Sequence, residues 1–384
     1  MKAFKWIAAI CLLPFAAQGQ VEKSGPWEMQ NSGTTASLRG IHAVGGGVAW
    51  AGGTNGTVLR TEDGGYMWQS CAMPPGAEKL DFRGIWAWDA DNAIVMSSGP
   101  GDQSRIYKTT DGCSHWTLLY TNPDKDGFWD AIQFTGPQQG IILGDPVGGF
   151  FTLLRTSDGG QHWTRVTSAS TPGLAADSSQ MGAFAASNSS LVFAAQVLNS
   201  LDEGNFIYWF VTGGTAGPYV IRGQSECDPK AFHRDPSHCW THWKVTSERL
   251  PLVTGSSAGA FSLAVLDGDE RIHHAVAVGG DYSRPNERSG TAAYWDESSR
   301  RWATASTPPE GYRSAVQILP DSATVGDYVN AIWIAAGTNG SDISYDGGKT
   351  WQPLDNGNWN ALSLPWIVGP KGRIAKLGSL PPHK

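Results

Sequence analysis

The sequence is poor in charge, because only 16% of its 384 residues are Asp, Glu, Lys or Arg. Helical bundles and coiled coils are rich in Ala, Glu, Lys and Leu, so this composition excludes both. Hydrophobic residues make up 40% of the chain, which excludes a disordered protein and suffices for a sizeable core. Glycine and tryptophan are in excess, with 48 and 18 copies. This combination is typical of many short strands joined by tight turns.

Motifs for redox and cofactor chemistry are also missing. The chain has no CxxC pair, no haem attachment motif and no dinucleotide-binding fingerprint. Beyond the N-terminus, no segment is apolar over the roughly 20 residues that a membrane helix needs. We therefore expect no cofactor and no membrane span. We also expect a monomer.

The N-terminus is typical of a secretory signal peptide. Lys2 and Lys5 precede a short apolar stretch over residues 6–17, and Ala17-Gln18-Gly19 fits a small-x-small cleavage site. An uncleaved membrane anchor is the alternative, but this stretch is too short to span a bilayer. We predict a signal peptide over residues 1–19 and a secreted or periplasmic mature chain over 20–384. Cleavage would remove two lysines and make the net charge more negative than −7, which excludes nucleic acid as a partner.

Four cysteines remain in the mature chain: Cys71, Cys113, Cys227 and Cys239. An even count in an oxidising compartment predicts two disulfides. Cys227 and Cys239 bracket an insertion at about residues 217–242, so we pair them, and Cys71 then pairs with Cys113 by elimination. Because the insertion also holds three histidines, a zinc site is the alternative. The cysteines and histidines are irregularly spaced, so we favour a disulfide-closed surface loop without metal. These histidines are His233, His238 and His242.

An eight-residue motif, Ser/Thr-x-Asp-Gly-(Gly)-x-x-Trp, occurs four times. Its aspartates are Asp63, Asp111, Asp158 and Asp346, and its tryptophans are Trp68, Trp116, Trp163 and Trp351. Asp-Gly between alternating strands predicts a hairpin in which glycine takes a positive φ. The carboxylate and the hydroxyl can accept N–H groups within the turn. A catalytic residue is needed once and not in every repeat, so we assign these aspartates a structural role.

Around each motif the sequence repeats a unit of four strands over roughly 40–45 residues, which is typical of a propeller blade. Six complete units are predicted: 38–75, 82–122, 128–170, 181–250, 258–308 and 312–354. A seventh begins at Trp359 and has only three strands, and residues 26–30 can supply its fourth. We therefore predict an all-β, seven-bladed propeller of four-stranded antiparallel blades. The N-terminal strand closes the ring, which leaves no open sheet edge.

The innermost strands line the axis of such a ring, and function is expected where their ends converge. Aligning the starts of these strands places one residue per blade at a shared position: Arg39, Arg83, Asp130, Gly182, Gly259, Arg313 and Asn360. Blades 6, 7, 1 and 2 are consecutive in a closed ring, so the three arginines and Asn360 would form a basic arc bounded by Asp130. We predict that this arc binds a carboxylate or a phosphate. Alternatively, each arginine pairs with an acidic turn residue: Asp102, Asp145 or Asp281.

The four motifs resemble the Asp-box, or BNR repeat, of β-propellers. That group includes sialidases, secreted glycoside hydrolases, sortilin-like receptors and photosystem II assembly factors. Seven blades and a signal peptide look most like the photosystem II assembly and stability factor type. The resemblance implies a binding or assembly scaffold with a protein partner or an anionic ligand, and we favour this over an enzymatic function.

A carbohydrate-active hydrolase is the alternative function that the resemblance implies. Sialidases use an arginine triad, a Tyr–Glu pair and an acidic residue on a six-bladed ring. Here no Arg-Ile-Pro follows the N-terminal strand, and neither Tyr282 nor Tyr312 has an evident Glu partner. Another glycosidase could use a carboxylate pair for acid–base catalysis. The candidate catalytic residues are Asp130, Asp145, Asp281 and Tyr282.

Overall fold

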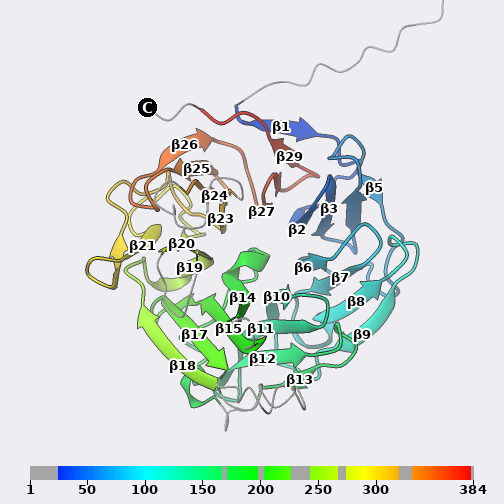
Figure 1. Ribbon diagram of the computed structural model, residues 1–384, viewed down its shortest axis with the longest axis horizontal. Helices are drawn as coiled ribbons and strands as arrows, with labels where there is room; N and C mark the ends of the chain where they lie inside the picture. Colours follow the sequence, from blue (N-terminus) through cyan, green and yellow to red (C-terminus); the bar gives the residue numbers. More distant parts are fainter. Residues whose placement is uncertain are drawn as a thin grey trace, which may run out of the picture.

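Seven antiparallel sheets surround a central axis in the computed structural model of the chain (Figure 1). It describes residues 25–166, 171–197, 203–225, 243–266, 274–319 and 331–381. The helices in these residues are three short 3-10 turns: η1 (Gly101–Gln103), η2 (Pro172–Leu174) and η3 (Asn188–Ser190). The all-β fold with seven antiparallel blades, predicted from the repeat, is confirmed.

The first three blades each run from the axis outward in chain order. Blade 1 consists of β2 (Leu38–Gly45), β3 (Val48–Gly53), β4 (Val58–Thr61) and β5 (Gln69–Ser70). Blade 2 consists of β6 (Phe82–Ala87), β7 (Ala93–Ser97), β8 (Arg105–Thr109) and β9 (Thr117–Thr121). Blade 3 consists of β10 (Trp129–Thr135), β11 (Gln139–Val147), β12 (Phe150–Thr156) and β13 (Thr164–Arg165).

The next three blades follow the same order, with one extra short strand. Blade 4 consists of β14 (Leu191–Val197), β15 (Glu203–Val211), β17 (Tyr219–Ser225) and β18 (Trp243–Arg249). Blade 5 consists of β19 (Gly255–Leu266), β20 (His274–Asp281), β21 (Ala292–Asp296) and β22 (Arg301–Thr304), and β16 (Gly213–Gly214) pairs with β19. Blade 6 consists of β23 (Ala315–Ile318), β24 (Trp333–Gly337), β25 (Gly340–Ser344) and β26 (Gln352–Asp355).

The N-terminal strand completes blade 7, as predicted. Blade 7 consists of β27 (Ala361–Ser363), β28 (Trp366–Val368), β29 (Ile374–Leu377) and β1 (Trp27–Gln30). β1 pairs antiparallel with β29 at the outer edge of the blade, so the first and last described strands share one sheet. The buried Trp27 donates its indole N–H to Ser341 Oγ of blade 6 over 2.9 Å. Ring closure therefore rests on backbone pairing and on one tryptophan packed between blades.

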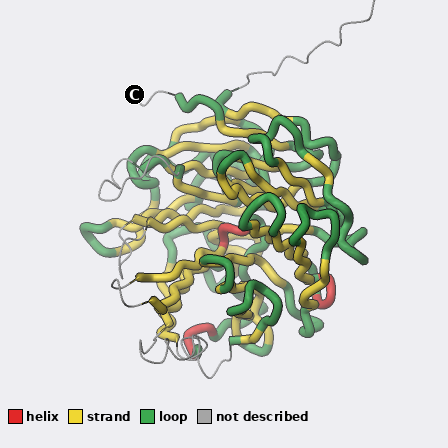
Figure 2. Tube along the Cα trace, turned by 45° about the vertical axis from the view of Figure 1, so that its right-hand side comes forward, coloured by secondary structure: helices red, strands yellow, loops and turns green. Residues whose placement is uncertain are grey.

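The hydrophobic core is divided into seven clusters, each between two neighbouring blades. A middle strand such as β7 is buried along its whole length, because sheets cover both of its faces. This explains why the middle strands are continuous apolar runs and not alternating patterns. Figure 2 shows the stacked strands in yellow, with most of the loops in green at their ends.

Blade 4 departs from the predicted repeat. Its innermost strand begins at Leu191 and not near residue 181. Residues 183–190, the crossing segment, instead approach the axis, where Figure 1 shows a green loop beside β14. Asn188 donates its amide to the carbonyls of Ile85 and Ile132, and Ser187 donates its hydroxyl to the carbonyl of Ser314. The crossing segment thus joins blades 2, 3 and 6. The predicted signal peptide and residues 226–242 of the predicted insertion lie outside the described residues.

Candidate functional site

A pocket of about 850 Å³ lies over the axis; six blades and the segment before blade 4 contribute to its lining. It lies at the end of the ring where the innermost strands start. Going round the ring from blade 1 to blade 7, with the crossing segment in the place of blade 4, the lining includes Arg39, Arg83, Asp130, Phe184, Phe261, Ser314 and Asn360. Four of them, Arg39, Arg83, Asp130 and Asn360, are residues that the alignment of first strands predicted for this face, and the aligned Gly182 also lines the pocket. In blades 4 to 6 the side chains that line the pocket come from residues other than the aligned ones: Phe184, Phe261 and Ser314.

Backbone register explains where the alignment succeeds. In blades 1, 2 and 3 the aligned residue lies at a register shift between two paired neighbours, as Arg39 does between Leu38 and Gly40. Such a bulge turns a side chain away from the regular alternation. In blade 5 the residue at this shift is Phe261, two positions after the predicted Gly259.

Arg313 was predicted to share this position and does not, because the register differs by one residue. Two glycines on the second strands show how blades 1 and 6 align. The carbonyl of Ser37 packs against Gly53 in blade 1, and the carbonyl of Tyr312 packs against Gly337 in blade 6. Ser37 and Tyr312 are therefore equivalent positions. Arg313 therefore matches the buried Leu38, and Ser314 takes the pocket position. A slip of one residue moves a side chain to the other face of its strand.

The interior holds Arg313 in a buried ion pair. Its Nε donates to Asp342 Oδ2 over 2.5 Å, and Nη2 is paired with the same oxygen. Nη1 donates to Asn339 Oδ1 over 2.6 Å and to the carbonyl of Tyr312 over 2.8 Å. Arg313 and Asp342 are 0% and 1% exposed, so this arginine cannot reach a ligand in the pocket.

The basic side of the pocket consists of Arg39 and Arg83 with one shared counterion, Asp81. Arg83 Nε and Nη2 both lie 2.9 Å from Asp81 Oδ2, and Arg39 Nε lies 3.9 Å from it. Burial, and then the charge of Arg83, lower the pKa of Arg39. One carboxylate balances only one of two arginines, so this side keeps a net positive charge. Sequence reasoning missed Asp81, although its spacing of two residues from Arg83 is the signal that could have identified it.

The acidic turn residues predicted as arginine partners pair elsewhere. Asp102 lies 3.9 Å from Arg105, outside the pocket. Asp281 accepts hydrogen bonds from Ser283 and Ser257 and pairs with Arg284. The Ser283 bond, followed by the others, lowers the pKa of Asp281. It therefore stays ionised and cannot act as a general acid, and it is not part of the pocket lining.

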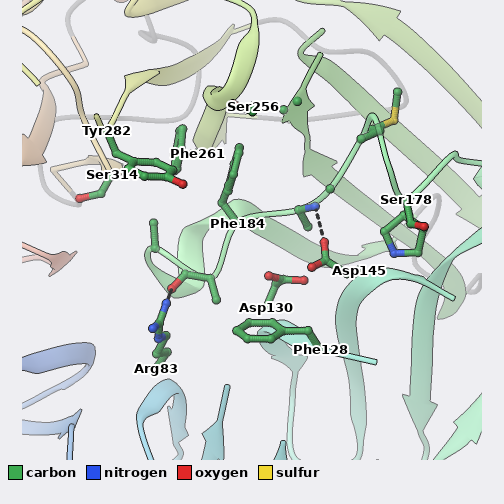
Figure 3. A pocket seen from close by; sticks show the side chains of 18 of the residues that line it. Arg83, Phe128, Asp130, Asp145, Ser178, Phe184, Ser256, Phe261, Tyr282 and Ser314 are labelled. Carbon is green, nitrogen blue, oxygen red and sulfur yellow. Dashed lines mark hydrogen bonds between the residues drawn. The ribbon is translucent and has the colours of Figure 1, made fainter. Parts of the chain in front are cut away.

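The acidic side is formed by Asp130 at the start of β10 and Asp145 in β11. Figure 3 shows the two carboxylates facing each other, between Phe128 and the crossing segment. Asp130 is 1% exposed, whereas Asp145 is half-buried and accepts the N–H of Ala183 over 2.9 Å. Burial raises the pKa of Asp130 far above its usual range, and the charge of Asp145 adds to this. Burial also raises the pKa of Asp145 to about 6.

An aromatic wall lies on the side of blades 4 and 5, where the alignment predicted only glycines. Phe184 and Phe261 stack with ring centroids 4.0 Å apart. Tyr282, which is 53% exposed, meets both rings edge-on (Figure 3). The buried Tyr312 meets Phe261 edge-on. Asn360 completes the pocket but donates its amide to the carbonyl of Leu38, which joins blade 7 to blade 1.

The four motif turns lie at the opposite end of the ring, between the third and fourth strands of their blades, and share one geometry. In the first, Thr61 Oγ1 donates to Asp63 Oδ1 over 2.9 Å, and Asp63 Oδ1 also accepts the N–H of Met67 over 3.0 Å. The turns at Asp111, Asp158 and Asp346 repeat both bonds. The motif tryptophans are all buried. These aspartates hold turns and lie away from the pocket.

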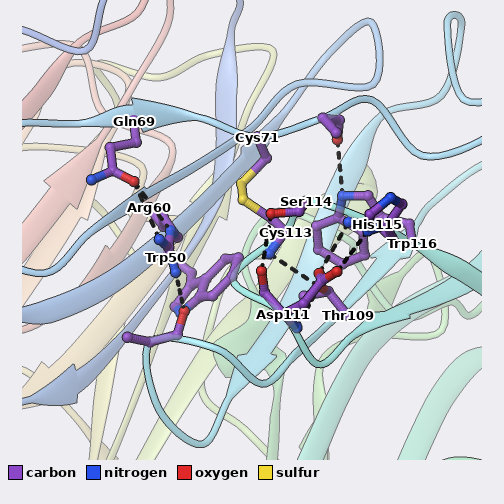
Figure 4. The surroundings of a disulfide bond; sticks show 12 residues. Trp50, Arg60, Gln69, Cys71, Thr109, Asp111, Cys113, Ser114, His115 and Trp116 are labelled. Carbon is purple, nitrogen blue, oxygen red and sulfur yellow. Dashed lines mark hydrogen bonds and ion pairs between the residues drawn. A yellow bond between two sulfur atoms is a disulfide. The ribbon is translucent and has the colours of Figure 1, made fainter.

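The second motif turn carries the disulfide between Cys113 and Cys71, which confirms this predicted pairing (Figure 4). Cys113 occupies the place of the second turn glycine and has a φ of 65°. Cys71 follows β5, so the bond joins blade 1 to blade 2. The predicted Cys227–Cys239 pair lies outside the described residues.

Removing this disulfide is expected to lower the free energy of unfolding by about 2–4 kcal/mol, because a cross-link over 42 residues restricts the unfolded chain. The variant is Cys71→Ser with Cys113→Gly, which returns glycine to the positive-φ position and so isolates the effect of the cross-link. Urea denaturation measures the change. A loss below about 0.5 kcal/mol would show that the blade contacts alone set the stability there.

Neither a metal centre nor a membrane helix occurs in the described part of the chain. No three His, Cys, Asp or Glu residues there are placed to hold a metal ion. No helix among the same residues is long and apolar enough to cross a membrane.

No protein-family model matches this chain, and no curated protein matches it. Solved structures do. "YCF48 bound to D1 peptide" has a TM-score of 0.56 and 18% identity, covering 96% of this chain and 100% of the other. "YCF48 from Cyanidioschyzon merolae" has a TM-score of 0.55 and 16% identity, covering 92% and 99%. The WD40 β-propeller domain of Doa1 has a TM-score of 0.51 and 13% identity, covering 92% and 97%. At such low identity these similarities establish the fold alone.

Proposed function

We propose that this protein is a secreted or periplasmic binding and assembly propeller that holds a segment of a partner protein in its axial pocket. The observation that carries the proposal is that Arg39 and Arg83 lie side by side with only one counterion, Asp81, next to an aromatic wall. Guanidinium groups bind carboxylates through charge-assisted hydrogen bonds. The rings of Phe184 and Phe261 offer apolar surface for the rest of a peptide.

Two further observations support this proposal. One structure of similar fold, YCF48, is a complex with a D1 peptide, which favours a peptide over a small metabolite as the ligand. The Cys71–Cys113 disulfide is in keeping with an oxidising compartment and with the predicted signal peptide. The resemblance of the four motif turns to Asp-box propellers supports the same class of scaffold.

Replacing Arg39 and Arg83 together by alanine is expected to weaken the binding of a five-residue alanine peptide with a free carboxylate by about 10- to 100-fold. This factor corresponds to the loss of charge-assisted hydrogen bonds. Calorimetry measures the affinity. The control variant is Arg105→Ala, since Arg105 pairs with Asp102 outside the pocket. An unchanged affinity in the double variant, or equal binding of the amide-capped peptide, would contradict the proposal.

A carbohydrate-active hydrolase is the second candidate, and one observation favours it. Asp145 has its pKa raised to about 6 by burial, a value suited to a general acid. Its neighbour Asp130 is 1% exposed, which leaves little access for a glycosidic bond between the two carboxyl groups. A glycan-hydrolysis screen with the wild type and Asp145→Asn decides the question. Activity that this variant abolishes would replace the scaffold proposal.

A further inference from the structure

No cation in the described residues forms an ion pair with Asp130 or Asp145 on the acidic side of the pocket, although the charge of Arg83 acts on Asp130. Asp130 Oδ2 is buried without a hydrogen-bond partner among them. Asp145 Oδ1 accepts the N–H of Ala183, whereas its Oδ2 accepts no hydrogen bond from the described residues. The exposed Asp126, from the loop before β10, lines the same side. A buried carboxylate without a partner is costly, and this cost is why the pKa of Asp130 is raised. A cation bound beside the two carboxyl groups would stabilise their ionised forms.

The nearest arginines are already committed to other groups. Arg83 places two nitrogens against Asp81, and its Nη1 donates to the carbonyl of Ala185 over 3.0 Å (Figure 3). Arg39 lies near the same Asp81, on the far side of Arg83 in the order of the blades. The pocket is therefore positive toward blades 1 and 2 and negative toward blade 3. A ligand that matches both sides carries an anion and a cation.

We propose that Asp145 and Asp130 form a subsite for the ammonium group of a lysine side chain in the same peptide whose carboxylate meets Arg39 and Arg83. This inference rests on the proposed function and names a feature of its ligand. Two observations on the chemistry of the subsite favour lysine over other cations.

First, the subsite suits an organic cation better than a metal ion. No third His, Cys, Asp or Glu in the described residues joins Asp130 and Asp145 in a ligating group, and metal sites in proteins use more ligands than two carboxylates. Phe128 and Phe184 lie on either side of the two carboxylates (Figure 3). These rings can pack against the methylene groups of a lysine, whose charged end then reaches the carboxylates.

Second, the subsite suits an ammonium better than a guanidinium. A guanidinium binds a carboxylate best as a fork, through two parallel bonds to both oxygens. Asp145 offers only one free oxygen, because Ala183 occupies the other. An ammonium is a compact point charge with three donors, so it can bind that oxygen and approach Asp130 behind it.

Proton linkage gives the subsite a pH signature. The charged groups near the two carboxylates are Arg83 from β6 and Asp126 from the loop before β10. The backbone N–H groups of Ala183, Ala185 and Asp145 also face them. Burial raises the pKa of Asp145 to about 6, so the carboxylates hold an extra proton when the pH falls below this value. A bound ammonium must displace that proton. Affinity for a lysine peptide is then expected to rise with pH up to about 6–7, by at most about tenfold per pH unit for one proton.

The test uses five-residue alanine peptides with a free carboxylate, with one lysine placed in turn at each of the last four positions. Matched peptides carry norleucine, which has the same stem without the charge. With the wild-type protein at pH 8, the best lysine peptide is expected to bind at least tenfold more tightly than its norleucine match. This preference should shrink at pH 5 and disappear in Asp145→Asn, whose amide oxygen can still accept the N–H of Ala183.

The control variant is Asp102→Asn, since Asp102 lies outside the pocket and should leave the preference unchanged. Equal binding of lysine and norleucine peptides would overturn the lysine subsite and leave the proposed function standing. Binding of amide-capped lysine peptides that depends on Asp145 but not on Arg39 or Arg83 would support the subsite and contradict the carboxylate site. No binding by any peptide would overturn both.

Discussion

Replacing Asp342 by alanine is expected to lower the free energy of unfolding by about 3–5 kcal/mol, because Arg313 would remain buried without its partner. Both side chains are almost inaccessible, and two guanidinium nitrogens of Arg313 contact the same carboxylate oxygen. Urea denaturation, followed by tryptophan fluorescence, measures the loss.

The control for this prediction removes both charges together. Replacing Arg313 by methionine and Asp342 by leucine leaves no uncompensated ion, and such exchanges of buried pairs are often neutral or stabilising. The double variant is therefore expected to be clearly more stable than Asp342→Ala. If the two variants lose the same stability, packing and not the unpaired charge is the cause.

The second large effect is expected at the ring closure. Replacing Trp27 by alanine should lower the free energy of unfolding by about 3–5 kcal/mol, the usual cost of removing a buried aromatic side chain. Trp27 is 1% exposed and donates its indole N–H to Ser341, and its ring centroid lies 6.2 Å from that of Trp359. Loss of β1 would also expose β29 as an open edge, so size-exclusion chromatography should show association.

Glu28→Ala is the matched control for Trp27→Ala, because Glu28 is the next residue of β1 and is exposed. Its effect is expected to stay within about 0.5 kcal/mol. If Trp27→Ala is equally mild, β1 does not hold the ring closed, and the other six blades determine the stability.

The fold was predictable because its signals are local. Each motif turn closes through hydrogen bonds within eight residues, as between Thr61, Asp63 and Met67. Four copies of this turn reveal the blade repeat. The seventh unit has only three strands and residues 26–30 can supply one extra strand, so the closure of the ring could be predicted as well. Where the turn is missing, in blades 4 and 5, the prediction failed in detail: the innermost strand of blade 4 begins about ten residues later than expected.

The pocket was predictable only in part. Alignment identified Arg39, Arg83 and Asp130, because blades 1 to 3 share their register. It misplaced Arg313, since Tyr-Arg-Ser-Ala resembles Phe-Arg-Gly-Ile and the close contact of Gly337 with Tyr312 shifts the strand by one residue. It also missed the aromatic wall, because Phe184 reaches the axis from a segment that is not part of the repeat.

The sequence by itself thus determined the number of blades, the direction of the strands and the closure of the ring. Only the tertiary structure decided which charges meet: Asp81 between two arginines, Asp145 against Asp130, and Asp342 against Arg313. The physical reason is that burial and pairing depend on contacts between blades far apart in the chain. All aspartates carry the same carboxyl group, but burial, nearby charges and hydrogen bonds set its pKa, and therefore whether it is ionised and what it can bind.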